Sequence, residues 1–286
     1  MWFHLRMVQF VNTKLCGNQL HTLQGAQMKY RAGFVAVTVL LVIHAYAERL
    51  TEKQEQNVIK YIEYEINRFD VHDENTLNKC LLKISELLKP YMKYGLKAWN
   101  VPVLDPLFLK TVKVSQNGND NNFKADFHSV WVYGLSEYTI EYMRSQPSKY
   151  SFDLKLKFPD LKLLGQYDID GKVLFLELKD QGPFTANLTN VDATVENKFT
   201  VKDGHLVLSE TKTNFSFKSM KFHLENLLKG SPVGKSINEM LNKNVDDLMQ
   251  DLKPAFSKEI SRIIVRTLNK SVERLPLAKW EAAISR

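Results

Sequence analysis

The stretch Phe152-Asp153-Leu154-Lys155-Leu156-Lys157-Phe158 alternates strictly between apolar and charged residues. Because successive side chains of a β-strand point to opposite faces, this alternation predicts a strand with one apolar and one solvated face. The same period of two extends outward in both directions, from about Leu107 to Leu227. No strand–helix–strand pattern interrupts it. The sequence therefore predicts a long antiparallel meander in an α+β protein, not a doubly wound parallel sheet.

Two Asp-Gly pairs inside this region have the sequence that is typical of tight hairpin turns. Asp170-Gly171 falls between Gln166–Ile169 and Lys172–Leu178, and Asp203-Gly204 falls between Val195–Val201 and His205–Ser209. We therefore predict one hairpin at each pair.

Apolar residues at helical spacing flank the meander on both sides. Before it, Glu48–Phe69 and a segment from about Asn75 are predicted helices, and Pro90 bends or ends the second. After it, helical spacing continues over Lys235–Val272, and Ser236-Ile237-Asn238-Glu239 has the spacing of a capping box. One helix of that length spans roughly 57 Å, whereas a compact globule of the 239 residues after residue 47 is about 45 Å across. We therefore expect an elongated molecule or a kink at Pro254, and the long apolar stripe favours elongation.

Residues 1–47 are predicted to precede the folded domain and to include a targeting segment. Lys29 and Arg31 precede the apolar run Ala32–Ile43 and the pattern Ala45-Tyr46-Ala47, as in a secretory signal peptide. As a helix the run is roughly 18 Å long, short of the ~30 Å hydrocarbon core, which favours a cleaved signal over an uncleaved anchor. We therefore expect a secreted, extracellular protein. Its parts are an untranslated or disordered extension (1–27), a signal peptide (28–47), a helical extension (48–69) and a single domain (70–280).

Secretion bears on the cysteines and on glycosylation. Cys80 is the only cysteine after residue 47, so we expect neither an internal disulfide nor a cysteine-based metal site. Three Asn-X-Ser/Thr sequons, at Asn187, Asn214 and Asn269, fit a secreted glycoprotein.

Charge and motifs exclude several classes of function. The formal net charge is +7, and residues 1–47 hold four of these positive charges. The remaining charge of +3 is too small to indicate binding to the phosphate backbone of nucleic acid. Gly230-Ser231-Pro232-Val233-Gly234 has its serine in the wrong position for a nucleophile elbow. Histidines lack metal-ligand spacing, and no Gly-rich phosphate loop occurs. We expect no catalytic residue, no metal and no cofactor.

Short motifs in a fixed order cover the chain from about Asp70 to Trp280. They lie at Cys80–Tyr91, Val101–Leu107, Val132–Ser136, Phe158–Leu161, Tyr167–Leu174, Asn242–Asn244, Leu252–Pro254 and Leu275–Leu277. In this order they resemble the insect haemolymph juvenile-hormone-binding and takeout family. The resemblance implies an elongated, highly curved antiparallel sheet wrapped around a long C-terminal helix, as in the tubular lipid-binding proteins, with an internal hydrophobic tunnel.

Two features of that family are altered in this chain. Members usually carry a cysteine about ten residues before the one that matches Cys80, where this sequence reads Asp70-Val71-His72. The small N-terminal disulfide that the family implies therefore lacks one partner. Of the glycine pair that usually follows the central strand, only Gly182 is kept.

The inward-facing apolar residues allow either a filled core or a lined cavity, and their pattern alone does not separate the two. The resemblance favours the cavity. It implies a secreted, non-catalytic carrier of a small hydrophobic ligand, such as a juvenile-hormone-like terpenoid, a fatty acid or another lipid. The residues predicted to line the tunnel are Phe152, Leu154, Leu156, Leu174, Leu176, Phe215, Phe217, Ile260 and Ile264.

Three other functions stay open at this point. A lipid- or microbial-surface recognition protein of the same fold would carry a basic or aromatic patch. A partner protein would have a filled core, and an esterase would hydrolyse the ligand. We expect no nucleic-acid partner and no stable membrane insertion, and we leave open a cell-surface receptor and the oligomeric state.

Overall fold

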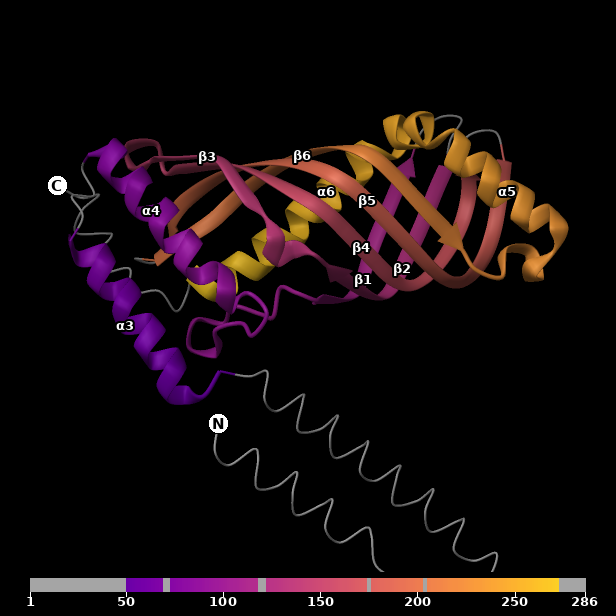
Figure 1. Cartoon of the computed structure of the whole chain (residues 1–286). Helices are drawn as coiled ribbons and strands as arrows, with labels where there is room; N and C mark the ends of the chain where they lie inside the picture. Colours follow the sequence, from indigo (N-terminus) through magenta and orange to yellow (C-terminus); the bar gives the residue numbers. More distant parts are fainter. Residues whose placement is uncertain (1–49, 69–72, 118–121, 174–175, 203–204, 273–286) are drawn as a thin grey trace, which may run out of the picture. The chain divides into compact units, whose positions relative to one another are not determined.

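One antiparallel sheet, with helices before and after it in the chain, makes up the computed structural model (Figure 1). It describes residues 50–68, 73–117, 122–173, 176–202 and 205–272, all within the unit Leu50–Arg286. What the sequence predicts for residues 1–47 lies outside these ranges. The strands are β1 (Leu107–Asn117), β2 (Asn122–Tyr133), β3 (Thr139–Gln146), β4 (Ser151–Val173), β5 (Leu176–Lys202) and β6 (His205–Leu224). The α-helices are α3 (Glu52–Arg68), α4 (Glu74–Leu88), α5 (Pro232–Lys243) and α6 (Val245–Val272).

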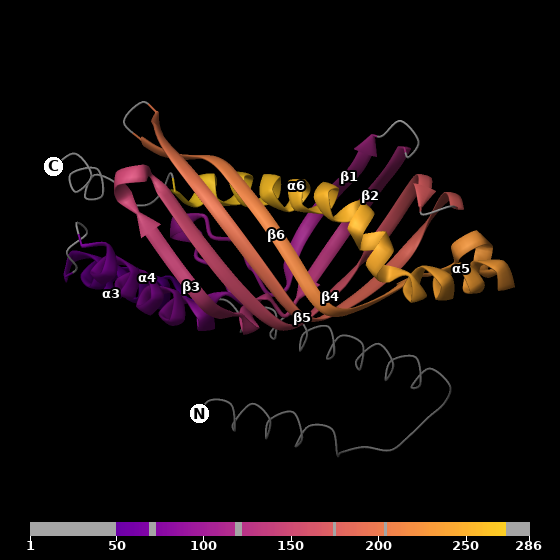
Figure 2. The ribbon, with the colours of Figure 1, turned by 90° about the horizontal axis from the view of Figure 1, so that it is seen from above.

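The strands form a meander with one branch. Their order is β1-β2-β4-β5-β6, and β3 pairs with β4. β2 pairs with Lys162–Gly171 of β4 and β3 pairs with Ser151–Lys157, so these two strands share one edge of β4. Every pairing is antiparallel. The predicted α+β class, with an antiparallel sheet packed on the C-terminal helix, is confirmed, and Figure 2 shows α6 following the curved sheet.

Of the two predicted hairpins, one is confirmed and one is misplaced. Lys202 pairs with His205, so β5 and β6 are joined where the sequence predicts, by two residues outside the described ranges. Asp170-Gly171, in contrast, lies inside β4, and the pairing with β5 runs on to Val173 and Leu176. Gly171 is paired on its other side as well, with Phe123 of β2. An Asp-Gly pair favours a turn, but continuous pairing on both sides overrides that local preference.

The C-terminal helical segment is two helices and not the single one predicted. They are separated at Asn244, whose φ of −113° and ψ of 32° are not helical. The predicted capping box at Ser236 is wrong, because α5 begins at Pro232 and its N-cap is Ser231, whose Oγ accepts a 3.1 Å hydrogen bond from the Gly234 amide. Proline suits the first helical position, since its φ is already helical and it has no N–H to satisfy. Pro254 lies within α6, which bends in that half in Figure 2.

Part-way along β5, the buried positions change from even-numbered to odd-numbered residues. In β5, Phe184 and Ala186 are buried before Asn190 and Val191 is buried after it, one residue out of the simple alternation. Asn190 has a φ of 48°, and one residue in this left-handed region shifts which side chains reach a given face. The sheet therefore packs as two regions. One contains Val114, Phe123, Ala125, Val130, Tyr167, Ile169, Leu178 and Phe184 with α5 and the start of α6, and the other is centred on Tyr138, Phe158 and Val191.

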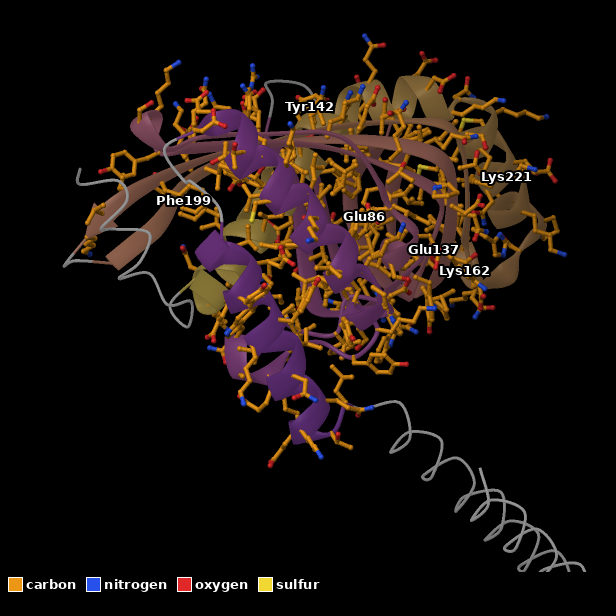
Figure 3. All side chains as sticks on the ribbon, turned by 60° about the vertical axis from the view of Figure 1, so that its left-hand side comes forward. Glu86, Glu137, Tyr142, Lys162, Phe199 and Lys221 are labelled. Carbon is orange, nitrogen blue, oxygen red and sulfur yellow. The ribbon has the colours of Figure 1, made fainter. Side chains whose placement is uncertain are left out.

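Helices α3 and α4 form a third cluster beside β3 (Figure 3). Ile59 and Ile62 of α3 pack against Cys80 and Ile84 of α4 and against Trp99. Cys80 is a free thiol that is only 2% exposed, and burial, with Glu65 adding to it, raises its pKa to about 11. A neutral, buried thiol is a poor nucleophile, so pairing with another chain would first require this cluster to open.

Candidate ligand-binding interior

β6 forms one edge of the sheet, and side chains of the C-terminal helices bond several of its backbone groups near its two ends. Asn238 accepts a hydrogen bond from the Leu224 amide at 2.9 Å and donates one to the Leu224 carbonyl at 2.8 Å. Asn242 makes the same pair of bonds with Phe222, at 2.9 and 2.7 Å. Asn269 repeats it with Leu208, at 2.8 and 3.1 Å. We call Asn238, Asn242 and Asn269 the asparagine seam, because each amide replaces a residue of a neighbouring strand.

The opposite edge of the sheet is β1, and it contacts α6, the helix that carries Asn269. The Lys113 amide donates a long, 3.5 Å hydrogen bond to Oε1 of Glu259, which is only 5% exposed. The other carboxylate oxygen of Glu259 lies 2.8 Å from Nη2 of Arg262, one turn further along α6. α6 therefore lies between the two edges of the curved sheet, and the sheet face that looks toward the helix is enclosed between them.

Pairing and contacts identify the side chains on this face. Thr213 of β6 donates from Oγ1 to the Ser257 carbonyl of α6 at 2.7 Å, so its side chain faces the helix. Val195 and Leu154 are its cross-strand neighbours, and paired residues share a face. Alternation then gives what we call the enclosed face: Phe152, Leu154, Leu156 and Phe158 of β4, Val191, Ala193, Val195 and Asn197 of β5, and Thr211, Thr213, Phe215 and Phe217 of β6. None of these residues is charged.

Much of the enclosed face keeps solvent-accessible surface. Phe158 and Val191 are buried, but the other apolar residues of the face are only partly buried. The polar pair Asn197 and Thr211 is buried and satisfied, since Thr211 donates to Asn197 and Asn197 donates to the Phe152 carbonyl. The apolar middle of the face is thus less tightly covered than its two ends.

Helix α6 presents an apolar arc to this face. The Ser261 hydroxyl points to β6 and the Glu259 carboxylate to β1, and at 100° per residue Ile260 and Ile264 fall between them on one side of the helix. The exposed Lys258 and Arg262 fall on the other side, which turns to solvent. Ile260 is nevertheless 36% exposed, so this apolar arc of α6 is incompletely covered.

The predicted lining residues fall into three groups. Phe152, Leu154, Leu156, Phe215 and Phe217 share the enclosed face, and Ile260 and Ile264 lie on the arc of α6 opposite it. Leu176 is brought to a different place, beside Leu178 of the first core cluster, and Leu174 lies outside the described residues. Sequence reasoning missed Ala193 and Val195, although the alternation Val191-Asp192-Ala193-Thr194-Val195 carries the same signal as β4.

The three sequons differ in their surroundings. Asn187 and Asn214 are exposed at positions that face away from the enclosed face. Asn269 is part of the asparagine seam, and both polar atoms of its amide bond the backbone of Leu208.

A carboxylate fixes the corner between β2 and β3. Asp105 accepts hydrogen bonds from the Gly134 amide, the Ser136 amide and the Ser136 hydroxyl, at 3.0, 3.0 and 2.5 Å. Burial raises the pKa of Asp105, but these bonds outweigh it and lower the pKa overall. Next to the corner, burial, with Glu86 adding to it, raises the pKa of Tyr138 to about 12, and the Tyr138 hydroxyl donates to the Ser85 carbonyl of α4 at 2.9 Å. Asp105 and Tyr138 therefore have structural roles: Asp105 holds the corner, and Tyr138 ties it to α4.

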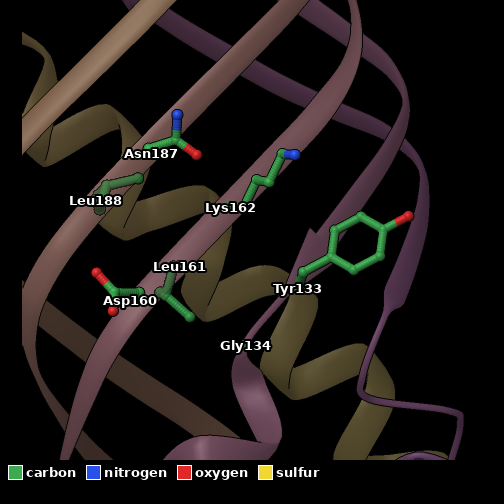
Figure 4. A pocket seen from close by; sticks show the side chains of 7 residues that line it. All are labelled: Tyr133, Gly134, Asp160, Leu161, Lys162, Asn187 and Leu188. Atoms are coloured by element: carbon green, nitrogen blue, oxygen red, sulfur yellow. The ribbon is translucent and has the colours of Figure 1, made fainter.

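A surface hollow of about 420 Å³ opens beside this corner (Figure 4). It is lined by Tyr133, Gly134, Asp160, Leu161, Lys162, Asn187 and Leu188. Its floor is apolar and its rim mixes both signs of charge.

The described residues contain neither a candidate metal site nor a helix that could span a membrane. No group of three or more His, Cys, Asp or Glu side chains there could hold a metal ion. In the same part of the chain, none of the helices combines the length and the apolar character needed to span a bilayer.

Comparison with known proteins gives concordant matches. The family model described as haemolymph juvenile hormone binding protein matches residues 54–281. The circadian clock-controlled protein daywake of Drosophila melanogaster is 25% identical over 210 residues, which are 69% of this chain and 79% of that protein. Daywake of Drosophila yakuba is 23% identical over 212 residues, 69% of this chain and 81% of that protein. The crystal structure of Epiphyas postvittana Takeout 1 matches with a TM-score of 0.58 at 19% identity, over 71% of this chain and 94% of that chain, and shows that the fold is shared.

Proposed function

Because this chain belongs to the haemolymph juvenile hormone binding protein family, we propose that it is a secreted, non-catalytic carrier that binds a small hydrophobic ligand between its sheet and α6. The observation that carries the proposal is the enclosed face, most of whose apolar side chains remain only partly buried although the C-terminal helices contact both edges of the sheet. An apolar concavity of this kind suits an apolar guest.

The magnitudes are consistent with a useful carrier. Burying a ligand of fifteen carbons gains roughly 12 kcal/mol at ~0.8 kcal/mol per CH₂. Lost freedom and ordering cost about 4–15 kcal/mol, so shape and preorganisation decide the net affinity. We expect dissociation constants that are micromolar or somewhat lower.

Filling the middle of the enclosed face is expected to weaken binding strongly. Ala193 is its smallest side chain, between Leu156 and Phe215 on the neighbouring strands, so Ala193→Trp would place an indole where the ligand lies. We expect at least about a tenfold loss of affinity for the neutral fluorescent probe N-phenyl-1-naphthylamine, the equivalent of about 1.4 kcal/mol. Titration of the protein into the probe, followed by fluorescence, measures it.

The matched control is Glu196→Trp, which adds the same side chain at an exposed position of the same strand. It should leave probe affinity unchanged. Equal affinities for native protein and Ala193→Trp would exclude the enclosed face as the binding site. Organic extraction of protein purified from its natural source, followed by mass spectrometry, should recover a lipid in near-stoichiometric amount.

A second candidate function, recognition of a lipid surface, is favoured by one observation. Phe108 of β1 and Trp131 of β2 are 46% and 40% exposed, with ring centroids 4.7 Å apart, and Tyr133 follows on the same face. Exposed tryptophan and tyrosine are typical of surfaces that meet the membrane interface. On this proposal, the protein sediments with vesicles containing phosphatidylserine, and Trp131→Ala reduces that binding severalfold. Retention of all protein in the supernatant would rule it out.

A further inference from the structure

One cation of α6 lies over the enclosed face. Nζ of Lys253 is 5.9 Å from the centroid of the Phe215 ring, and the lysine side chain is partly buried. Lys253 precedes Ser257 by one helical turn, and Ser257 is the residue whose carbonyl accepts the Thr213 hydroxyl. The lysine and the serine therefore lie on the flank of α6 that meets β6, at neighbouring positions along this strand.

The chain supplies no negative partner for this ammonium. Within the described ranges, no aspartate or glutamate oxygen lies within ion-pair distance of Lys253, whereas lysines on the outer side of the sheet, such as Lys155 and Lys157, pair with Glu141. The enclosed face below Lys253 has no charged residue. The nearest acid along α6, Asp251, is exposed and points to another side of the helix.

An ammonium placed over apolar side chains is unfavourable unless a counter-charge compensates it. The contact with the face of the Phe215 ring offsets part of that cost, because the ring quadrupole attracts a cation. A ligand carboxylate would offset much more, since charge-assisted hydrogen bonds to an ammonium are short and strong.

We infer that the ligand of this protein carries a carboxylate, as a fatty acid does, and that Lys253 binds that head group. The inference rests on the proposed carrier function and adds the chemical class of the ligand. Phe215, Ala193 and Leu156 are directly paired across β6, β5 and β4, so they form a row that leads away from Lys253 across the face. Ala193, with the smallest side chain of the row, is at its middle, and we place the apolar chain of the ligand there.

The test compares ligands that share one chain and differ in the head group. Palmitic acid, methyl palmitate and hexadecanol are titrated into full-length mature protein loaded with N-phenyl-1-naphthylamine, at about pH 8, where the acid is ionised. Native protein should release the probe at about tenfold lower concentration of palmitate than of either neutral lipid. Lys253→Met should remove this preference and leave methyl palmitate binding unchanged, and Lys253→Arg should restore most of it.

Lys258→Met is the matched control, because Lys258 is exposed on the opposite side of α6. It should keep the native preference. Equal binding of acid and ester by native protein would overturn the inference without any variant being needed, as would full palmitate affinity in Lys253→Met. Failure of the probe itself to bind native protein would instead overturn the carrier function, so the two failures are distinguishable.

Discussion

Replacing Asn238 by aspartate is expected to lower the free energy of unfolding by about 3 kcal/mol or more. Asn238 is 6% exposed, and its amide both accepts from and donates to the backbone of Leu224. Aspartate has nearly the same shape but no N–H, so a carboxylate oxygen would face the Leu224 carbonyl. A buried acceptor left unsatisfied costs about 1–3 kcal/mol, and a charged group costs more. Guanidinium unfolding followed by circular dichroism measures the change in midpoint.

The control is Asn214→Asp, which makes the same chemical change at an exposed position of β6 that faces away from the enclosed face. Its effect should stay within about 0.5 kcal/mol. If both variants unfold at the same midpoint, the asparagine seam does not hold α5 to the sheet edge and its amides are replaceable by solvent. A large loss at Asn238 alone shows that this amide holds α5 to the edge of β6.

The asparagine seam also shows what the sequence could and could not predict. Alternation identified the strands, because a sheet with one buried face imposes a period of two on every strand. It did not predict the seam, because an amide side chain bonds an edge strand only when the tertiary fold brings the helix beside it. A weak signal was present: Asn238 and Asn242 lie one turn apart within the apolar pattern that includes Ile237, Met240 and Leu241.

Several of the predicted lining residues share one face of the sheet where local pattern and pairing agree. Phe152, Leu154 and Leu156 could be grouped with Phe215 and Phe217 because both stretches alternate cleanly. Their common face depends on β5 lying between them, and the register that places Ala193 in the centre is a tertiary property. Leu176 was predicted to line the same tunnel from the stretch Lys172–Leu178, which was expected to follow a turn at Asp170-Gly171. The chain turns later, and the Leu176 side chain lies near Leu178 instead.

Lys253 was missed for a different reason. A lysine in an amphipathic helix is usually a solvated residue, and helical spacing alone does not reveal which residues of the flank lie over an apolar sheet face. The contact with Phe215 fixes its place. Polar residues at the border of an apolar stripe are therefore the positions where a sequence-based site assignment is least informative, and where ligand specificity is most easily built.

Replacing Gly134 by alanine is expected to destabilise the protein by about 3 kcal/mol and to loosen the corner between β2 and β3. Gly134 has a φ of 91°, which costs an alanine about 1–2 kcal/mol. A Cβ there would also overlap the Asp160 carbonyl oxygen, and relief of such a clash by backbone movement costs a further 1–3 kcal/mol or so. That movement would pull the Gly134 amide away from Asp105, which holds Ser136 as well. Thermal and guanidinium unfolding both measure the loss.

Gly230→Ala separates the two contributions to this effect. Gly230 also has a positive φ, 71°, but a Cβ there would meet no atom within 4 Å. Gly230→Ala should therefore lower the free energy of unfolding only by the cost of the positive φ, about 1 kcal/mol. A Gly134→Ala variant no less stable than Gly230→Ala would mean that the Asp160 carbonyl yields freely and that the corner is not rigid. If the expected difference is found, the corner holds β2 and β3 in fixed relation along one edge of β4, next to the cluster of Tyr138, Phe158 and Val191.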